Sequence, residues 1–594
     1  MIVTHSISIR VWHSFIVFIK SYLARYTSLN IFYLHFIWFV IFGCFRILRI
    51  LRTFFLTYFS YAIHFSINLF TFWSLQIRVS FLIDWMSMSF IRVVLTISTI
   101  IIVYSYNYIA PYSKSIYFLW LTVIFVIRML FVVSMSNLFF AMLGWDGLGL
   151  ISFFLIVYYQ NQSSIVSGSF TLLINRLGDR FFLVTLVLIF YGYSDFTYFS
   201  SNLGNALLII FIVITFITKR ALYPFSPWLP MAIAAPTPIS ALVHSSTLVT
   251  AGLYLIIRFS YLLYSCPEMI KLLTFIAIFT SFYAGMNTIF EIDLKKLIAL
   301  STLRHLGFIA IAFSAGLLHL RFFHLLVHAL FKSLLFITIG DIIININHRQ
   351  DIRYLSKGSI YTPFSSTVIR VSIINLLGIP NIRGYFSKDL VLESMNFRNL
   401  SVFVMFILYI NVLFTYYYSY KLLFFRFQSV KLNSFQLFHN PYLIHSFLML
   451  FLSISTLFFS TIFINFLFSY MIFYFMMPVI KFLPLILNTL VFVYLLVVLS
   501  LPRVKIKSVF SFFSSIMFLS NVMMRFSSTL YIKYLFNSVK RLEIGFINYS
   551  FNTLPRHYFN SLSSFIYRTL YRIRYRSIMS FFILFFFILL SRSI

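Results

Sequence analysis

The sequence predicts an all-α polytopic membrane protein with about 14–16 transmembrane helices. Apolar residues make up 61% of its 594 residues and charged residues only 10%, whereas a soluble domain is about 25% charged. Apolar runs long enough to cross a bilayer recur along the chain, for example Leu272–Phe290, Phe322–Ile346 and Val402–Tyr420. Two further segments are interrupted by proline or glycine, and paired interruptions are typical of an inverted repeat that contains two broken helices.

The net charge of +33 does not indicate a nucleic-acid-binding protein. The basic residues are scattered between apolar spans instead of being gathered in one soluble patch. Lys and Arg at the ends of membrane spans contact anionic lipid headgroups and set the orientation of the protein. We therefore expect membrane lipids as partners and no nucleic acid.

The chain offers no recognisable site for a redox cofactor of its own. Its two cysteines, Cys44 and Cys266, lie far apart in apolar surroundings, which excludes a self-contained iron–sulfur or disulfide framework. Gly144, Gly147 and Gly149 have the wrong spacing for a dinucleotide-binding loop and lie between apolar runs. We expect no cofactor and no metal in this chain.

Composition divides the chain into five predicted parts. Most of the acidic residues and most of the ionisable groups inside apolar segments fall in the second part. The parts are N-terminal transmembrane helices (1–114), an ion-bearing core (115–400), C-terminal transmembrane helices (401–502), a lateral amphipathic helix (503–576) and a terminal membrane anchor (577–594).

The predicted lateral helix is recognised by its charge. Residues 503–576 contain twelve Lys or Arg and one acid, Glu543. Arg525, Lys533 and Lys540 are spaced so that they lie near one helical face. This pattern is typical of a helix that lies along a membrane surface, with an interruption at Pro555.

The first interrupted segment runs from Thr218 to Thr250 and holds five of the fourteen prolines. It carries Lys219 at one end and His244 near the other. Prolines open the hydrogen-bond ladder of a membrane helix, and ionisable groups in such a setting are costly unless they have a function. A desolvated lysine can change its charge near neutral pH, and a histidine can relay a proton. The alternatives are a lysine that snorkels to the surface and a structural histidine.

Asp146 lies in an apolar stretch without another charge, MLGWDGLGLISFFL. Its position favours a carboxylate that holds or modulates a proton site, with a helix cap that faces the headgroups as the alternative. Asp179 has Arg176 and Arg180 close by in the sequence, so an ordinary electrostatic role is at least as good an interpretation.

His324, His328 and Lys332 follow one another at intervals of four residues and share one helix face. A ladder of titratable groups along an apolar helix favours a proton relay. Two histidines at this spacing can also bind a metal, but the glutamate of the HExxH motif and a nearby third ligand are absent from the sequence.

The second interrupted segment is marked by Gly378, Pro380 and Gly384 and is followed by Lys388 and Asp389. Adjacent residues point about 100° apart on a helix, which argues against a tight pair between the two and predicts a separate partner for each.

These motifs resemble a known family. GWDGLGLISFFLI, NRLGD, PWLPMAIAAPTPISALVHSSTLVTAG, DLKKLIALST, HALFKSLLF, QDIR and GYFSKD occur in the order found in the antiporter-like membrane subunits of respiratory complex I, NADH–ubiquinone oxidoreductase. The resemblance covers about residues 80–400. The predicted lateral helix and anchor favour chain 5 of that complex over its shorter siblings.

The resemblance implies a role for each buried ionisable residue. Lys219 matches the lysine of the first broken helix, and His244 matches a bridging histidine. Lys332 matches the central lysine, with His324 and His328 beside it. Lys388 matches the lysine of the second broken helix, with Asp389 next to it. Asp146 occupies the acid position of a GWEG-like motif, one methylene shorter than glutamate. Arg220 and Leu222 depart from the family pattern.

The function that the resemblance implies is proton translocation driven by electron transfer in partner subunits. NADH, FMN, iron–sulfur clusters and ubiquinone would then belong to partners, and the chain 4 antiporter-like subunit would be a neighbour. Phe (79) and Tyr (39) are abundant; their codons are AT-rich, which favours the mitochondrial inner membrane over a bacterial plasma membrane. The alternatives are a subunit of a multisubunit cation/proton antiporter and a structural strap with an inactive channel.

Overall fold

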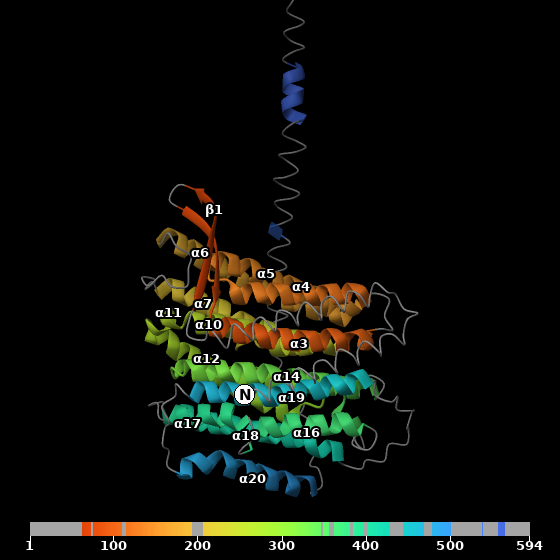
Figure 1. Ribbon diagram of the computed structural model, residues 1–594. Helices are drawn as coiled ribbons and strands as arrows, with labels where there is room; N and C mark the ends of the chain where they lie inside the picture. The colour runs from red at the N-terminus through yellow and green to blue at the C-terminus, as the bar shows by residue number, and fades with distance from the viewer. Residues whose placement is uncertain are drawn as a thin grey trace, which may run out of the picture. The chain divides into compact units, whose positions relative to one another are not determined.

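The computed structural model describes a largely helical chain (Figure 1). It divides into two units, Met1–Met517 and Phe518–Ile594. The predictions for residues 1–61 and for most of 503–594, including the lateral helix and the anchor, lie outside the described residues; in the second unit, residues 556–564 are helical. The described residues are 62–72, 75–109, 115–192, 206–345, 349–355, 362–379, 384–396, 401–427, 443–468, 478–500, 537–538 and 556–564.

Helices long and apolar enough to cross a membrane confirm the polytopic helical class. The described residues contain eight such segments. They comprise α3 (Trp85–Ile109), α4 (Ser115–Ser134), α5 (Leu138–Ile156), a broken segment that ends in α10 (Leu248–Arg258), α12 (Pro267–Phe290), α13 (Leu294–Ser314), α14 (Leu318–Asn345) and α18 (Val402–Phe427). Further helices are α6 (Gln162–Gly192), α7 (Ala206–Lys219), α11 (Ser260–Tyr264), α16 (Pro363–Leu377), α17 (Leu390–Asn396), α19 (Leu443–Phe468) and α20 (Pro478–Ser500).

A β-hairpin precedes the first described helix and was not predicted. Strands β1 (Ile63–Phe72) and β2 (Leu75–Ile83) pair antiparallel, with an irregularity near Asn68. The start of β1 alternates apolar and polar residues, which is typical of a strand. Three hydrogen bonds fasten β2 to the α4–α5 connection. The hydroxyl of Ser136 donates to Ser80 Oγ at 2.6 Å, its amide donates to the Ser80 carbonyl at 2.9 Å, and the Asn137 side chain donates to the Arg78 carbonyl at 2.8 Å.

Helix α14 lies at the centre of the first unit. It packs against α3, α13, α16 and α19 and against the π-helical turn η3 (Ser240–Thr247). All of its apolar window is buried inside the chain, whereas only 44% of the window of α12 is buried. The charges of α14 are therefore enclosed by protein, so that neighbouring side chains must satisfy them.

The first interruption begins where α7 ends at Lys219. The amide of Leu222 donates to the carbonyl of Ile217, and that of Ala221 donates to the carbonyl of Thr218. These two bonds form a Schellman motif, and Ala221 adopts the left-handed conformation with φ of 55°. The helix therefore ends in a defined cap before the proline-rich stretch begins.

The chain after that cap proceeds in short helical pieces. They are α8 (Trp228–Met231), the 3₁₀ turn η2 (Ala232–Ala234), α9 (Thr237–Ile239), η3 and α10. Proline prevents a continuous helix here because each proline lacks an amide donor. The hydroxyls of Ser246 and Thr247 donate to the Leu242 carbonyl, at 2.9 and 2.7 Å, within the wide π turn that also carries His244.

The second interruption has the same plan with different residues. Helix α16 ends at Gly378, which is left-handed with φ of 71°. The chain resumes as the π-helical turn η5 (Tyr385–Asp389) and continues into α17. Both predicted breaks are thus present, and Pro380 itself lies outside the described residues.

Candidate functional site

Lys219 occupies a buried site between α5, α6 and α7. Its side chain is 2% exposed, and Nζ lies 3.6 Å from Asp179 Oδ1. The amine also donates to the carbonyl of Trp145 at 3.4 Å and sits 5.1 Å from the centre of that indole ring. A β-carbon at Gly149 would lie 3.1 Å from Nζ, so glycine leaves room for the amine. The snorkelling alternative for Lys219 is therefore wrong.

Asp146 is connected to this lysine indirectly. Its carboxylate pairs with Arg176 at 3.4 Å, and Arg176 lies 3.8 Å from Asp179. Among the described residues Asp146 forms no ion pair with Lys219, because the partner of the lysine is Asp179. Asp146 is 31% exposed and Asp179 only 5%, so the deeper carboxylate compensates the lysine.

Sequence reasoning gave Asp179 an ordinary electrostatic role, whereas the structure places it in the site. A signal was present: Arg176 and Asp179 stand three residues apart within the apolar helix α6, which puts them on one face. The unexpected Arg220 is fully buried and donates to the carbonyl of Leu306 at 3.3 Å. It therefore does not snorkel to the membrane surface.

His244 lies in the π turn η3 and is buried. Its ring meets the indole of Trp228 edge-on, with 6.3 Å between the ring centres. Turn η3 packs against α14, and α10 packs against α7. His244 therefore sits on an element that connects the Lys219 helix with the central helix.

Three histidines gather on the face that α13 and α14 share. The ring of His305 lies 6.0 Å from that of His324 and 5.3 Å from that of His328. The α14 pair is itself separated by 6.4 Å. All three side chains are buried. The predicted ladder is therefore a cluster, and His305 is a member that sequence reasoning missed.

Lys332 continues this cluster toward α18. It is fully buried, and Nζ donates to Ser301 Oγ at 2.6 Å and to Tyr418 Oη at 3.4 Å. Both partners are neutral hydroxyls. Among the described residues no carboxylate lies within 4.0 Å of this amine.

Lys388 and Asp389 contact different residues, but each lies in the electrostatic field of the other. Lys388 Nζ donates to Thr415 Oγ1 at 2.9 Å and lies 4.3 Å from the ring centre of Tyr416. Asp389 faces Gly378, where a β-carbon would lie 3.1 Å from Oδ2. Both side chains are buried. In the described part of the chain they form no ion pair with each other.

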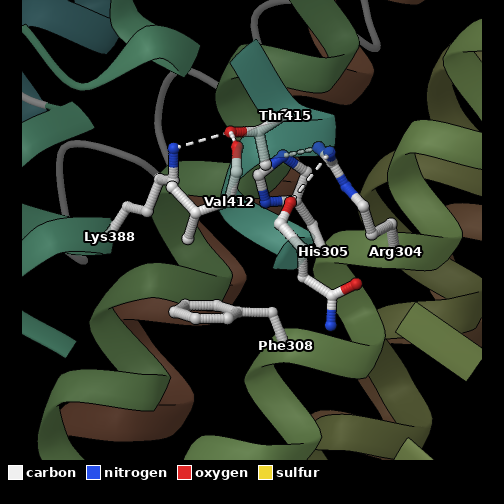
Figure 2. Close-up of a pocket in the computed structure, with 7 residues that line it drawn as sticks. Arg304, His305, Phe308, Lys388, Val412 and Thr415 are labelled. Atoms are coloured by element: carbon white, nitrogen blue, oxygen red, sulfur yellow. Dashed lines mark hydrogen bonds between the residues drawn. The ribbon is translucent and has the colours of Figure 1, made fainter. Parts of the chain in front are cut away.

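A small cavity joins the Lys388 side to the histidine cluster (Figure 2). It offers about 10 Å³ for the centre of a water molecule, close to the space that one water needs. Its polar lining comes from three helical elements, and Phe308 and Val412 supply apolar lining. The polar side chains are Arg304, His305, Lys388, Asn411 and Thr415.

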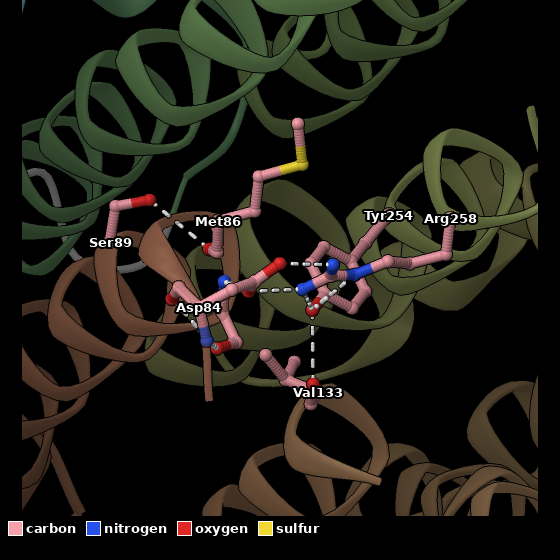
Figure 3. A network of polar contacts seen from close by, with 7 residues as sticks. Asp84, Met86, Ser89, Val133, Tyr254 and Arg258 are labelled. Carbon is pink, nitrogen blue, oxygen red and sulfur yellow. Dashed lines mark hydrogen bonds and ion pairs between the residues drawn. The ribbon is translucent and has the colours of Figure 1, made fainter. Parts of the chain in front are cut away.

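A separate network anchors the end of the segment that carries His244 (Figure 3). Arg258 at the end of α10 holds Asp84 in a two-pronged ion pair, and its Nε and Nη2 donate to Tyr254 Oη at 2.9 and 2.6 Å. Tyr254 donates in turn to the Val133 carbonyl at 3.0 Å. Burial raises the pKa of Asp84, but the hydrogen bonds and charge of Arg258 outweigh it and hold the pKa below its ordinary value.

Asp84 also caps α3. Its Oδ1 accepts the amide of Ser87, and Ser87 Oγ accepts the amide of Asp84, both at 2.9 Å. This reciprocal arrangement satisfies two amides at the helix start. The network thus connects the starts and ends of three helices, α3, α4 and α10.

The arrangement can hold and pass protons but offers little to a metal. No group of three or more His, Cys, Asp or Glu is placed to hold a metal among the residues that the structure describes. Buried lysines, histidines and carboxylates instead follow one another from α5 to η5, with hydroxyls and a water-sized cavity between them. Titratable groups of this kind inside membrane helices are typical of proton relays.

Fold and site together define an antiporter-like membrane protein with two broken helices. Residues 135–415 match the family described as NADH:quinone oxidoreductase/Mrp antiporter, TM. Residues 69–118 match the N-terminus of NADH-ubiquinone oxidoreductase (complex I) chain 5. The first match includes every predicted site residue.

Curated relatives narrow this class. NADH-ubiquinone oxidoreductase chain 5 of Anopheles arabiensis is 42% identical over 339 residues, which cover 56% of this chain and 88% of that protein. Chain 5 of Anopheles quadrimaculatus is 42% identical over 59% of this chain, and that of Locusta migratoria is 40% identical over 60%. The chain belongs to the NADH-ubiquinone oxidoreductase chain 5 family. It spans 62% and 63% of the length of the latter two relatives.

A solved structure shares the fold. A chain of the Mrp complex from Dietzia sp. DQ12-45-1b superposes with a TM-score of 0.65 and 21% identity, over 77% of this chain and 53% of that one. At this identity the likeness concerns the fold alone.

Proposed function

We propose that this chain is a proton-translocating membrane-arm subunit of respiratory complex I. Electron transfer from NADH to ubiquinone in partner subunits would drive protons through it. The observation that carries the proposal is the row of buried titratable groups on and between the two broken helices. Burying such groups in a membrane interior is expensive, and their placement at helix breaks is typical of an ion path.

The proposed route follows the order of stations that the family resemblance implies. A proton held at Lys219 passes through His244 to Lys332 and leaves by Lys388. Asp179 stabilises the charged form of Lys219, and Arg176 connects that carboxylate to Asp146. A partner subunit that draws Asp146 and Arg176 away would leave Lys219 as the cation paired with Asp179. The charged form of Lys219 would then be stabilised more strongly, because Arg176 would no longer compete for that carboxylate.

The partners and location follow from the same proposal. NADH, FMN, the iron–sulfur clusters and ubiquinone are assigned to other subunits, with no cofactor in this chain. The chain 4 antiporter-like subunit and membrane lipids are the neighbours. Animal relatives such as those of Anopheles and Locusta support the mitochondrial inner membrane as the location of this multi-pass protein.

The test is Lys332→Ala in the assembled complex. We expect fewer protons pumped per NADH oxidised, because the central station loses its titratable group. Lys271→Ala, which changes an exposed lysine on α12, is the control and should pump normally. An unchanged proton yield in Lys332→Ala would instead favour a structural strap.

A multisubunit cation/proton antiporter remains the second candidate, because the Mrp complex shares the fold. Native electrophoresis of the source membranes separates the two. We expect the chain, identified by peptide mass spectrometry, to migrate with the band that stains for NADH dehydrogenase activity. Migration apart from that band would favour the antiporter.

A further inference from the structure

Arg304 on α13 is a buried cation that the proton route does not use. Its side chain is 1% exposed. A guanidinium is not deprotonated in proteins, so this charge is permanent, whereas the lysines nearby can become neutral. Within the described part of the chain, no carboxylate lies within 4.0 Å of it.

The contacts of Arg304 are neutral. Nη1 donates to the carbonyl of Asn411 at 3.5 Å, and the guanidinium lies 4.8 Å from the ring centre of Tyr418. Nη2 lies 3.2 Å from His305 Nε2. Because a guanidinium can only donate, Nε2 accepts this bond and the neutral ring carries its proton on Nδ1. His305 therefore holds Arg304 in place without cancelling its charge.

Arg304 stands between two stations of the route. On one side it shares Tyr418 with Lys332, whose Nζ lies 5.3 Å from the same ring centre. On the other side it lines the water-sized cavity together with Lys388 (Figure 2). A proton that travels between the two lysines by way of this cavity therefore passes close to the guanidinium.

The other titratable groups around this passage act on its two ends differently. His305, His324 and His328 are neutral or positive in any protonation state. Asp389 interacts electrostatically with its neighbour Lys388, but it forms no ion pair with Arg304 among the described residues. A fixed positive charge in a low-dielectric passage repels an excess proton strongly, and a positively charged arginine in a pore excludes protons in this way.

We propose that Arg304 is an electrostatic barrier that prevents protons from flowing passively between Lys332 and Lys388. The proposal rests on the proposed function, since it assumes that protons use these two lysines. Arg304 acts on the passage through its charge and does not itself carry the proton. A proton can pass it only when the side chains around Arg304 rearrange, and we infer that this happens while electron transfer drives the complex and not at rest.

The experiment measures the passive proton conductance of the intact complex in proteoliposomes. A potassium diffusion potential is applied without NADH, and a pH-sensitive dye reports proton entry. For Arg304→Gln we expect a leak about tenfold or more above that of the unmodified complex, with electron transfer retained and fewer protons pumped per NADH. Arg304→Lys keeps a cation at the site and should leak less than Arg304→Gln.

Two controls separate charge from packing. Arg321→Gln removes an equally buried arginine that donates to Leu317 at 3.1 Å, stacks on Phe313 and does not line the cavity. Asn411→Ala changes the cavity lining but keeps the Arg304 charge. Both should leak like the unmodified complex. Equal leaks in Asn411→Ala and Arg304→Gln, or an assembled Arg304→Gln complex with an unchanged leak, would overturn the proposal.

If Arg304→Gln does not assemble, Arg304→Met is measured in its place, because it keeps a long side chain without the charge. It should leak about tenfold more than the unmodified complex, and an assembled Arg304→Met complex with an unchanged leak would overturn the proposal. Failure of the proposed function is distinguished by Lys332→Ala: if that variant pumps normally, the route itself is wrong. In the double variant with Arg304→Gln, Lys332→Ala should abolish the leak.

Discussion

The surroundings of Lys219 and of Lys388 follow the same plan but differ in charge. Each lysine stands beside an interrupted helix. Around Lys219, two carboxylates and two cations alternate as a chain of ion pairs: Asp146, Arg176, Asp179 and Lys219. Around Lys388, the amine binds a hydroxyl, and the nearest fixed charge on the cavity wall is a second cation, Arg304.

This difference teaches that similar breaks can hold a lysine by different means. At the first site a carboxylate stabilises the charged amine directly, so the ion pair decides the state of the site. At the second site the amine contacts a neutral hydroxyl, and its charge is opposed by the cation Arg304 and offset by Asp389 without a direct ion pair. The two sites should therefore respond differently when their acids are removed.

The largest effect is expected for Asp179→Asn. It leaves the buried Lys219 without its carboxylate, and losing one partner of a buried ion pair typically costs about 3–5 kcal/mol. Asp389→Asn removes an acid that has no ion pair in the described structure and should cost about 1 kcal/mol. Thermal unfolding of the assembled complex measures both. Equal losses of stability would show that the two sites are not different in this respect.

A smaller, pH-dependent effect is expected at the anchor of the first segment. Asp84→Asn keeps the helix cap but removes the charge that Arg258 holds, at a cost of about 2 kcal/mol near neutral pH. Since the folded pKa of Asp84 is lowered, its contribution is present above the unfolded pKa of about 4 and is lost as pH falls through the folded value.

The measurement compares the unfolding of the unmodified and Asp84→Asn proteins at a series of pH values. Their stabilities should converge in acid. A gap that stays constant down to the lowest pH would mean that the ion pair does not stabilise this end of α10.

The smallest effects concern the residues that end the helices at the two breaks. Both are left-handed, but one is Ala221 and the other Gly378. A β-carbon in this conformation costs about 1 kcal/mol, so Gly378→Ala should destabilise and Ala221→Gly should stabilise the protein by about that amount. The same unfolding assay reads the two opposite shifts, and shifts of the same sign would contradict the comparison.

Much of the site was predictable because its residues stand out from an apolar background. Seven of the predicted site residues are buried, as expected for ionisable residues within apolar segments: Lys219, His244, His324, His328, Lys332, Lys388 and Asp389. Arg304 and His305 were missed because they end a short polar run, STLRH, that is typical of the ordinary surface of a helix. Only the packing of α13 against α14 and α18 encloses them.

Asp179 shows a different limit. Its two arginine neighbours in the sequence suggested that it was already satisfied. In the folded chain one of these neighbours, Arg176, also pairs with Asp146. Lys219 at the end of α7 then lies next to the carboxylate of Asp179. Pairing between helices depends on which faces meet, and one-dimensional spacing does not contain that information.

The sequence by itself determined that this is a multi-pass helical membrane protein with two broken helices and charged residues beside them, because hydropathy, proline and glycine act locally along the chain. Only the tertiary structure decided which charges neutralise one another. It paired Lys219 with Asp179 and placed Arg304 near Lys332 and Lys388, with no carboxylate of the described residues within 4.0 Å. Electrostatic energies depend on distance and burial in space, and both are set when helices far apart in the sequence pack together.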